Sequence, residues 1–155
     1  MELTLMNRNE ITICGDVIET SLDTCEKDLG ELWNNFRKEK SNIVFENTTE
    51  YSKGLYGLMW YTQNHRYCYL LGKETNSDRT DIDSIRVKKV PAARYAVVSV
   101  PENMPITEAW TVFFEKILPE AGYIPDSDHG LYFEYYEDED SKTCELWTPV
   151  KEKNL

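Results

Sequence analysis

The chain has few of the features that mark secreted or membrane-spanning proteins. Its four cysteines, Cys14, Cys25, Cys68 and Cys144, lie far apart and form no CxxC pair. The amino terminus, MELTLMNRNE, lacks the apolar run of a signal peptide. No stretch approaches the ~20 consecutive apolar residues of a membrane span. These absences predict a cytoplasmic protein with free thiols and no membrane association.

Basic residues are too few for a protein that binds nucleic acid. The 155 residues include 17 Lys and Arg against 28 Asp and Glu, which gives a formal net charge of -11. The phosphate backbone would be repelled by such a surface, so direct nucleic-acid binding is not expected. The acidic balance suits cationic partners, although solubility alone explains most of it.

Motifs for metal, phosphate or nucleophilic chemistry are missing as well. The two histidines, His65 and His129, lie in turn-like segments without ligand spacing to the cysteines, so no metal site is expected. The sequence has no glycine-rich phosphate loop, no GxSxG and no Ser-His-Asp series. We therefore expect no cofactor.

Hydrophobic and aromatic residues are plentiful and predict one globular domain over residues 1–155. The hydrophobic fraction is 41%, and the chain contains 4 Trp, 10 Tyr and 5 Phe. Apolar periodicity and helix-capping signals predict the following elements. They are a strand at 10–14 ended by Gly15, a helix from about Cys25 to Lys38, a hairpin after Gly54, a short extended piece near 85–87, a strand at 94–100, a helix over 106–117 that Pro119 ends or kinks, and a hairpin over 130–151.

The two halves share this order of strand, helix, strand and strand. The triplet Gly-Leu-Tyr recurs after 76 residues, Cys68 precedes Cys144 by 76 and Trp33 precedes Trp110 by 77. The pattern predicts an α+β domain built from a duplicated β-α-β-β unit, with repeat one at about 1–75 and repeat two at about 90–151. Because a unit of ~75 residues buries its sheet face poorly alone, the units should pair about a pseudo-twofold axis and leave a central groove.

Glu145 is the first candidate for a ligand contact in that groove. Side chains alternate across a strand, so Glu145, Trp147 and Pro149 share one side. A carboxylate among aromatic rings loses hydration, and a bound cation would compensate for that loss. The local pattern fits a solvated edge strand equally well. However, the 76-residue overlay matches Glu145 to Tyr69, which favours a position facing the groove.

Segments from both halves resemble a known family. In the first half they are ITICGD, ELW, YGLMWY, YCYLLGKE and VPAARYAVV; in the second half they are RYAVVSV, MPITEAW followed by ILPEAGY, LYFEYY and CELWTPV. In this order they resemble the GyrI-like effector-binding domain, the ligand-sensing part of AraC-type and MerR-type transcription regulators. The resemblance covers essentially the whole chain. It implies a duplicated, curved antiparallel sheet with two main helices over a central cleft, where a buried glutamate contacts cationic, lipophilic ligands.

The resemblance also implies which residues line the cleft. The family's pocket glutamate falls on Glu145, its helix tryptophan on Trp110 and a strand aromatic on Tyr69. Glu134 in LYFEYY resembles a recurrent family acid and ranks second, because its facing is not fixed by the sequence. Trp147 and Phe114 complete the expected aromatic walls.

Three functions are weighed on these residues. The favoured one is a stand-alone module that senses or sequesters hydrophobic, cationic small molecules, because no DNA-binding helices accompany the domain in the sequence. The second is a hydrolase of strained cyclopropane-type compounds, with Glu145 as general base and Tyr69 placing water. The third is a protein-binding role toward a regulator or DNA gyrase through the acidic run 137–140. Binding outweighs catalysis, and the acidic run is most simply a solvated turn.

Overall fold

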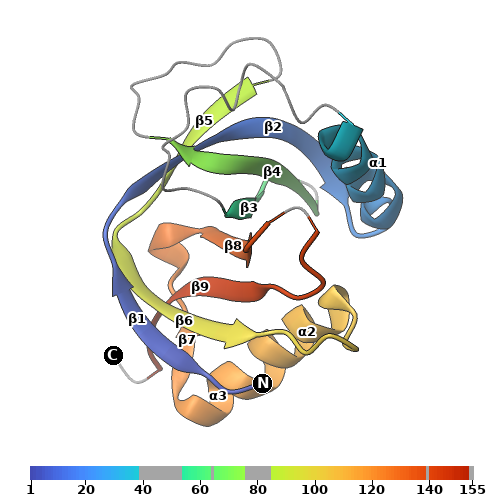
Figure 1. Cartoon of the computed structure of the whole chain (residues 1–155). Helices are drawn as coiled ribbons and strands as arrows, with labels where there is room; N and C mark the ends of the chain where they lie inside the picture. Colours follow the sequence, from blue (N-terminus) through green and yellow to red (C-terminus); the bar gives the residue numbers. More distant parts are fainter. Residues whose placement is uncertain (39–53, 64, 76–84, 139, 154–155) are drawn as a thin grey trace.

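A single curled antiparallel sheet forms the centre of the protein (Figure 1). The computed structural model describes residues 1–38, 54–63, 65–75, 85–138 and 140–153. Eight strands follow the order β1-β6-β9-β8-β3-β4-β2-β5, and β7 pairs with the end of β9. The strands are β1 (Thr4–Arg8), β2 (Ile11–Ser21), β3 (Leu55–Tyr61), β4 (Arg66–Thr75), β5 (Ile85–Val90), β6 (Ala93–Ser99), β7 (Tyr123–Pro125), β8 (Leu131–Tyr136) and β9 (Glu145–Glu152).

Two main helical segments lie on the same side of the molecule (Figure 1). The first is α1 (Cys25–Lys38), and the second runs through α2 (Ile106–Val112), a π-helical turn (Phe113–Ile117) and α3 (Leu118–Ala121). Within the described residues, no helix is long and apolar enough to cross a membrane. We call the side of the sheet against which these helices pack the helix face, and the other side the opposite face.

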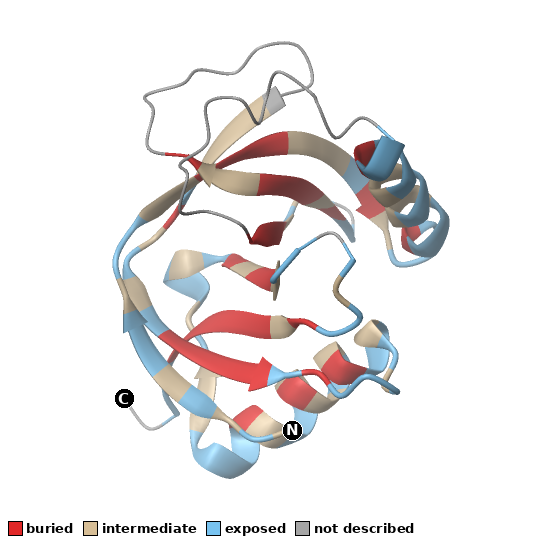
Figure 2. Ribbon diagram, in the orientation of Figure 1, coloured by how far each residue is buried: buried red, intermediate tan, exposed pale blue. Residues whose placement is uncertain are grey.

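Each face of the sheet has its own packed core. On the helix face, strand residues such as Tyr69 and Leu146 pack against Phe36 of α1 and Phe113 of the π-helical turn. On the opposite face, one cluster draws side chains from every strand between β2 and β9 except β7. A sheet that curls onto itself brings such distant strands together. Figure 2 shows the buried residues concentrated along the central strands.

The π-helical turn follows from Pro119. Proline has no backbone N–H to donate and its ring crowds the preceding turn, so regular α-helical bonding is interrupted there. The Leu118 N–H accordingly donates to the carbonyl of Phe113, five residues back. Gly122 then ends the segment with φ of 84°, a left-handed conformation that favours glycine. The expected kink at Pro119 is thus a widened turn that carries Phe113 and Phe114.

The sequence predicted the class and most elements correctly. The α+β class, the curled antiparallel sheet and the two main helices are confirmed, and α1 has the expected bounds. The predicted strand end at Gly15 is wrong, because β2 continues to Ser21. A Cβ at Gly15 would collide with the Leu71 carbonyl, so this glycine permits close approach of β2 and β4 instead of ending a strand. β1 was not predicted, and all four cysteines are free.

Candidate functional site

Glu134 is a buried carboxylate in the middle of the sheet. It lies on β8, opposite Gly57 of β3 on one side and Leu146 of β9 on the other. Strand alternation places Tyr132, Glu134 and Tyr136 together on the helix face. Only 5% of the Glu134 surface is exposed. An ionised carboxylate at this depth requires strong local stabilisation.

Three neutral donors supply that stabilisation. The hydroxyls of Tyr69 and Tyr136 both donate to Oε1 of Glu134 at 2.9 Å. The indole N–H of Trp110 donates to Oε2 at 3.1 Å. Among the described residues, no lysine, arginine or histidine forms an ion pair with Glu134. Within the part of the chain that the structure describes, this acidic group therefore has no cationic partner.

Burial and hydrogen bonding act on the Glu134 pKa in opposite directions. Burial raises the pKa because it penalises the charged form, whereas the bonds from Trp110, Tyr136 and Tyr69 lower it. The net effect is a pKa raised above its ordinary value. Burial and the Glu134 charge together raise the pKa values of the Tyr69 and Tyr136 hydroxyls, so both remain protonated donors at neutral pH.

Gly57 allows Tyr69 to reach Glu134. Tyr69 lies on β4 and Glu134 on β8, and β3 runs between these strands. A Cβ at Gly57 would collide with the Tyr69 hydroxyl. Because glycine has no side chain, the tyrosine ring can cross β3 at this point. The contact between Tyr69 and Glu134 thus depends on a small residue between them.

Aromatic rings from both helices enclose the carboxylate. Trp110 of α2 stacks on Phe114 with ring centroids 5.3 Å apart, and it meets the Tyr132 ring edge-to-face at 5.1 Å. Trp33 of α1 contacts the Tyr136 ring at 4.9 Å. Ring faces attract cations, so the cluster has a carboxylate and aromatic surface together.

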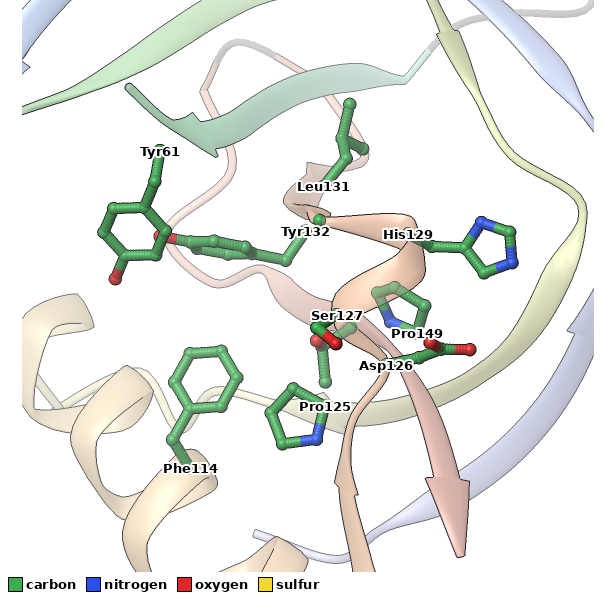
Figure 3. Close-up of a pocket in the computed structure, with 11 residues that line it drawn as sticks. Tyr61, Phe114, Pro125, Asp126, Ser127, His129, Leu131, Tyr132 and Pro149 are labelled. Atoms are coloured by element: carbon green, nitrogen blue, oxygen red, sulfur yellow. The ribbon is translucent and has the colours of Figure 1, made fainter. Parts of the chain in front are cut away.

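An open pocket lies next to this cluster (Figure 3). We call it the strand-gap pocket, and its volume is about 540 Å³. Phe114, Tyr132 and Tyr61 provide aromatic surface on one side, while His129 lies on the other side of the view in Figure 3. The complete lining consists of Tyr61, Phe114, Pro125, Asp126, Ser127, His129, Gly130, Leu131, Tyr132, Thr148 and Pro149.

The six expected site residues divide between the two faces of the sheet. Four come together on the helix face, namely Glu134, Tyr69, Trp110 and Phe114. Glu145 and Trp147 lie on the opposite face, where Glu145 accepts a bond from the Trp147 indole at 3.2 Å. Glu145 is only half-buried and Glu134 lies deeper. The expectation that Glu145 shares the groove with Tyr69 is therefore wrong, whereas Glu134, whose facing the sequence left open, lies on the same face as Tyr69.

The error comes from the register of the overlay. A shift of one residue exchanges the faces of every side chain in a strand. The 76-residue offset matches Tyr69, on the helix face, with Glu145, on the opposite face. An offset of 77, the spacing from Trp33 to Trp110, matches Tyr69 with Leu146 and Gly57 with Glu134, and keeps each pair on the helix face.

Several residues of the site were missed by the sequence reasoning. Tyr132 and Tyr136 share the Glu134 face by simple alternation, so a correct choice of glutamate would have found them. Trp33 was not among the expected site residues, yet it lies half-buried against Tyr136. No local signal marked Gly57, because its role depends on a tyrosine from the neighbouring strand. The described residues contain no group of three or more His, Cys, Asp or Glu that could hold a metal.

A curled antiparallel sheet with two main helices is the fold of GyrI-like effector-binding domains. The family model of Cass2, described as integron-associated effector binding protein, matches residues 4–150. The chain therefore belongs to the Cass2 family of effector-binding proteins, and small-molecule binding is the function that this family supports. No curated protein matches the chain.

Solved structures show the same fold at low sequence identity. SAV2435 bound to tetraphenylphosphonium is 18% identical with a TM-score of 0.75, covering 97% of this chain and 94% of that one. The integron cassette protein VCH_CASS2, from the mobile metagenome of Vibrio cholerae, is 19% identical with a TM-score of 0.67 over 96% and 95% of the two chains. The EcmrR C-terminal domain is 11% identical with a TM-score of 0.65 over 97% and 98%.

Proposed function

We propose that the protein binds hydrophobic cations on its helix face, with Glu134 as the counter-charge. The observation that carries this proposal is a carboxylate that is 5% exposed and receives three hydrogen bonds, all from neutral donors. Those donors hold the group in place without cancelling its charge. A cationic ligand would supply the missing positive charge in a site where water screens it little.

The oxygens of Glu134 differ in how open they are to a ligand. Oε1 already accepts from both Tyr69 and Tyr136, whereas Oε2 accepts only from Trp110. Trp110 is half-buried and belongs to a helix that continues into the π-helical turn. A cation would approach Oε2 from the Trp110 side and contact the rings of Trp110, Tyr132 and Phe114. The surrounding rings favour a cation that itself carries aromatic groups.

The tetraphenylphosphonium bound to SAV2435 supports this choice of ligand class. That compound combines a single positive charge with four aromatic rings. In this chain, binding could serve sequestration of such a compound or sensing through a partner protein. The cytoplasm is the compartment that we propose for either role.

Hydrolysis is the second candidate function. The sequence suggested Glu145 and Tyr69 as its catalytic pair, and the structure requires a different pair. Glu145 and Tyr69 lie on opposite faces and do not act on one substrate together. Glu134 and Tyr69 are hydrogen-bonded at 2.9 Å, so they are the pair that a hydrolase reading would use. A raised carboxyl pKa suits a general base. Each binding experiment should therefore include recovery of the ligand to detect conversion.

The decisive experiment is a titration with tetraphenylphosphonium followed by tryptophan fluorescence. Trp110 contacts Glu134 directly, so binding there should quench its emission. Glu134→Gln removes the negative charge and leaves the bound cation without a counter-charge. The loss should be about 3 kcal/mol of binding free energy, which weakens binding about a hundredfold. The matched control is Glu145→Gln, which removes one glutamate charge from the opposite face and should change the affinity less than about twofold.

Two further samples complete this experiment. Triphenylphosphine oxide, a neutral aromatic analogue, should not compete for the site. Thermal unfolding should show that both variants fold. Equal loss of binding in both glutamate variants, or unchanged binding in Glu134→Gln, would reject Glu134 as the counter-charge.

A further inference from the structure

The strand-gap pocket exists because β8 and β9 separate. The two strands pair at only three positions, the last toward this end being Phe133 with Trp147. Beyond them β9 continues along β6 and then pairs with β7, beginning at Pro125 and Val150. Pro149 has no N–H to offer to β8, so the ladder is not extended there. The Asp126 N–H donates to the Pro149 carbonyl at 2.8 Å and places the 125–130 segment beside the gap.

The lining of this pocket suits an apolar, flat molecule. Phe114, Tyr132, Leu131, Pro125 and Pro149 give it a mostly hydrocarbon and aromatic surface. Ligand sites commonly combine such a surface with a few polar groups that fix orientation. Asp126 is one polar group, but its side chain already accepts from the Asp128 N–H at 3.1 Å.

Thr148 is the buried polar group of this lining. It lines the pocket and only 2% of its surface is exposed. Within the part of the chain that the structure describes, its hydroxyl has no hydrogen-bond partner. A buried hydroxyl without a partner costs stability, and most such groups in proteins are satisfied. A ligand in the pocket would satisfy this one.

The pocket borders the Glu134 cluster but does not include the carboxylate. The Tyr132 and Trp110 rings, with centroids 5.1 Å apart, belong to the boundary, because Tyr132 lines the pocket and Trp110 binds the carboxylate. A molecule in the pocket can therefore be bound while Glu134 keeps its three donors.

We propose that the strand-gap pocket is a second binding site, for a neutral aromatic compound that carries a hydrogen-bonding group read by Thr148. The polarity of the site fits this class, since the hydroxyl can donate to a carbonyl or accept from a hydroxyl. The two sites share the rings of Phe114 and Tyr132, but only cation binding requires the charge of Glu134.

The test compares two probes that differ by one hydroxyl, 2-naphthol and naphthalene. Equilibrium dialysis of the wild-type protein should show tighter binding of 2-naphthol by about fivefold, the usual effect of one hydrogen bond. The preference should disappear in Thr148→Val, which has the same shape without the hydroxyl. It should persist in Thr148→Ser, which keeps the hydroxyl.

The same variants separate this proposal from the first. Glu134→Gln should leave 2-naphthol binding unchanged while it weakens tetraphenylphosphonium binding. Loss of 2-naphthol binding in Glu134→Gln would show that pocket and carboxylate are one site and would overturn the separate-site proposal alone. A melting temperature of Thr148→Val equal to or above that of the wild type is expected. A clear decrease would mean that the hydroxyl is satisfied within the protein, which also contradicts the proposal.

Discussion

The two faces of the central strands carry opposite charges among their aromatic rings. On the helix face, Glu134 lies among aromatic rings and receives only neutral donors. On the opposite face, the guanidinium of Arg8 lies 5.0 Å from the Trp147 ring centroid and 5.9 Å from that of Phe133. Its Nη2 also donates to the Tyr56 hydroxyl at 2.8 Å. The opposite face thus holds a cation within its aromatic cluster. On the helix face, Arg37 of α1 lies 5.5 Å from the Trp33 ring centroid, but among the described residues no cation forms an ion pair with Glu134.

The pKa values of the tyrosines on the two faces reflect this difference in charge. On the opposite face, Arg8 lowers the pKa values of Tyr56 and Tyr95 against the larger raising effect of burial. On the helix face, Glu134 adds to the effect of burial and raises the pKa values of Tyr69 and Tyr136 further. The comparison teaches that aromatic surface alone does not define a cation site. What matters is whether the chain already supplies the cation.

The largest effect on stability is expected from filling the space above Gly57, where the Tyr69 ring crosses β3 to reach Glu134. Gly57→Ala places a methyl group against the Tyr69 hydroxyl, so the ring must move and its bond to the carboxylate is lost. The expected loss of unfolding free energy is about 3 kcal/mol. Gly30→Ala is the control, because its added Cβ meets nothing within 4 Å. In α1 it should stabilise the protein by about 1 kcal/mol.

Chemical denaturation of both variants measures these changes. Tetraphenylphosphonium binding should weaken in Gly57→Ala and stay unchanged in Gly30→Ala. A Gly57→Ala protein with wild-type stability and affinity would show that Tyr69 does not need the path across β3.

A smaller effect is expected from removing the cation of the opposite face. Arg8→Met keeps a long side chain but loses the charge, the ring contacts and the bond to Tyr56. The loss of stability should be about 1–2 kcal/mol. Since the helix face is untouched, tetraphenylphosphonium affinity at Glu134 should stay within about twofold of the wild-type value. Urea unfolding and the fluorescence titration measure the two quantities.

A different outcome of this substitution would change the comparison. Loss of cation binding in Arg8→Met would show that the two faces are coupled. A second equivalent of tetraphenylphosphonium bound by the variant would show that the vacated rings form a cation site once Arg8 is gone.

Local patterns in the sequence predicted much of the fold. The helix Cys25–Lys38 has an apolar stripe and basic residues in its last turn, and both signals come from neighbouring residues. Pro119 and Gly122 likewise marked the end of the second helix. By contrast, β1 pairs with β6, which is distant in sequence: Thr4 pairs with Val97, 93 residues later. A strand of five residues with such a distant partner leaves little local signal.

The facing of the two glutamates was the part that the sequence could not decide. Glu134 and Glu145 each alternate with aromatic residues, so both patterns fit a strand with one apolar side. Only pairing with neighbouring strands fixes the faces: Glu134 lies opposite Gly57, and Glu145 lies opposite Tyr135. The buried hydroxyl of Thr148 is equally a property of the assembled sheet, because the pocket forms where two strands part.

The most direct test of the account is the pH dependence of tetraphenylphosphonium binding to the wild type and Glu134→Gln. In the proposed function the cation pairs with the ionised carboxylate, and burial raises the Glu134 pKa above its ordinary value of 4.5. Affinity should therefore rise about tenfold per pH unit below that raised pKa and level off above it. Burial disfavours the ionised form of Glu134 in the folded protein, so without ligand the protonated carboxyl stabilises the fold. This stabilisation is complete below pH 4.5 and is lost as the pH rises through the raised pKa. Glu134→Gln should bind weakly and show neither dependence. An affinity that is the same at every pH in the wild type, or a rise that persists in Glu134→Gln, would contradict the central claim.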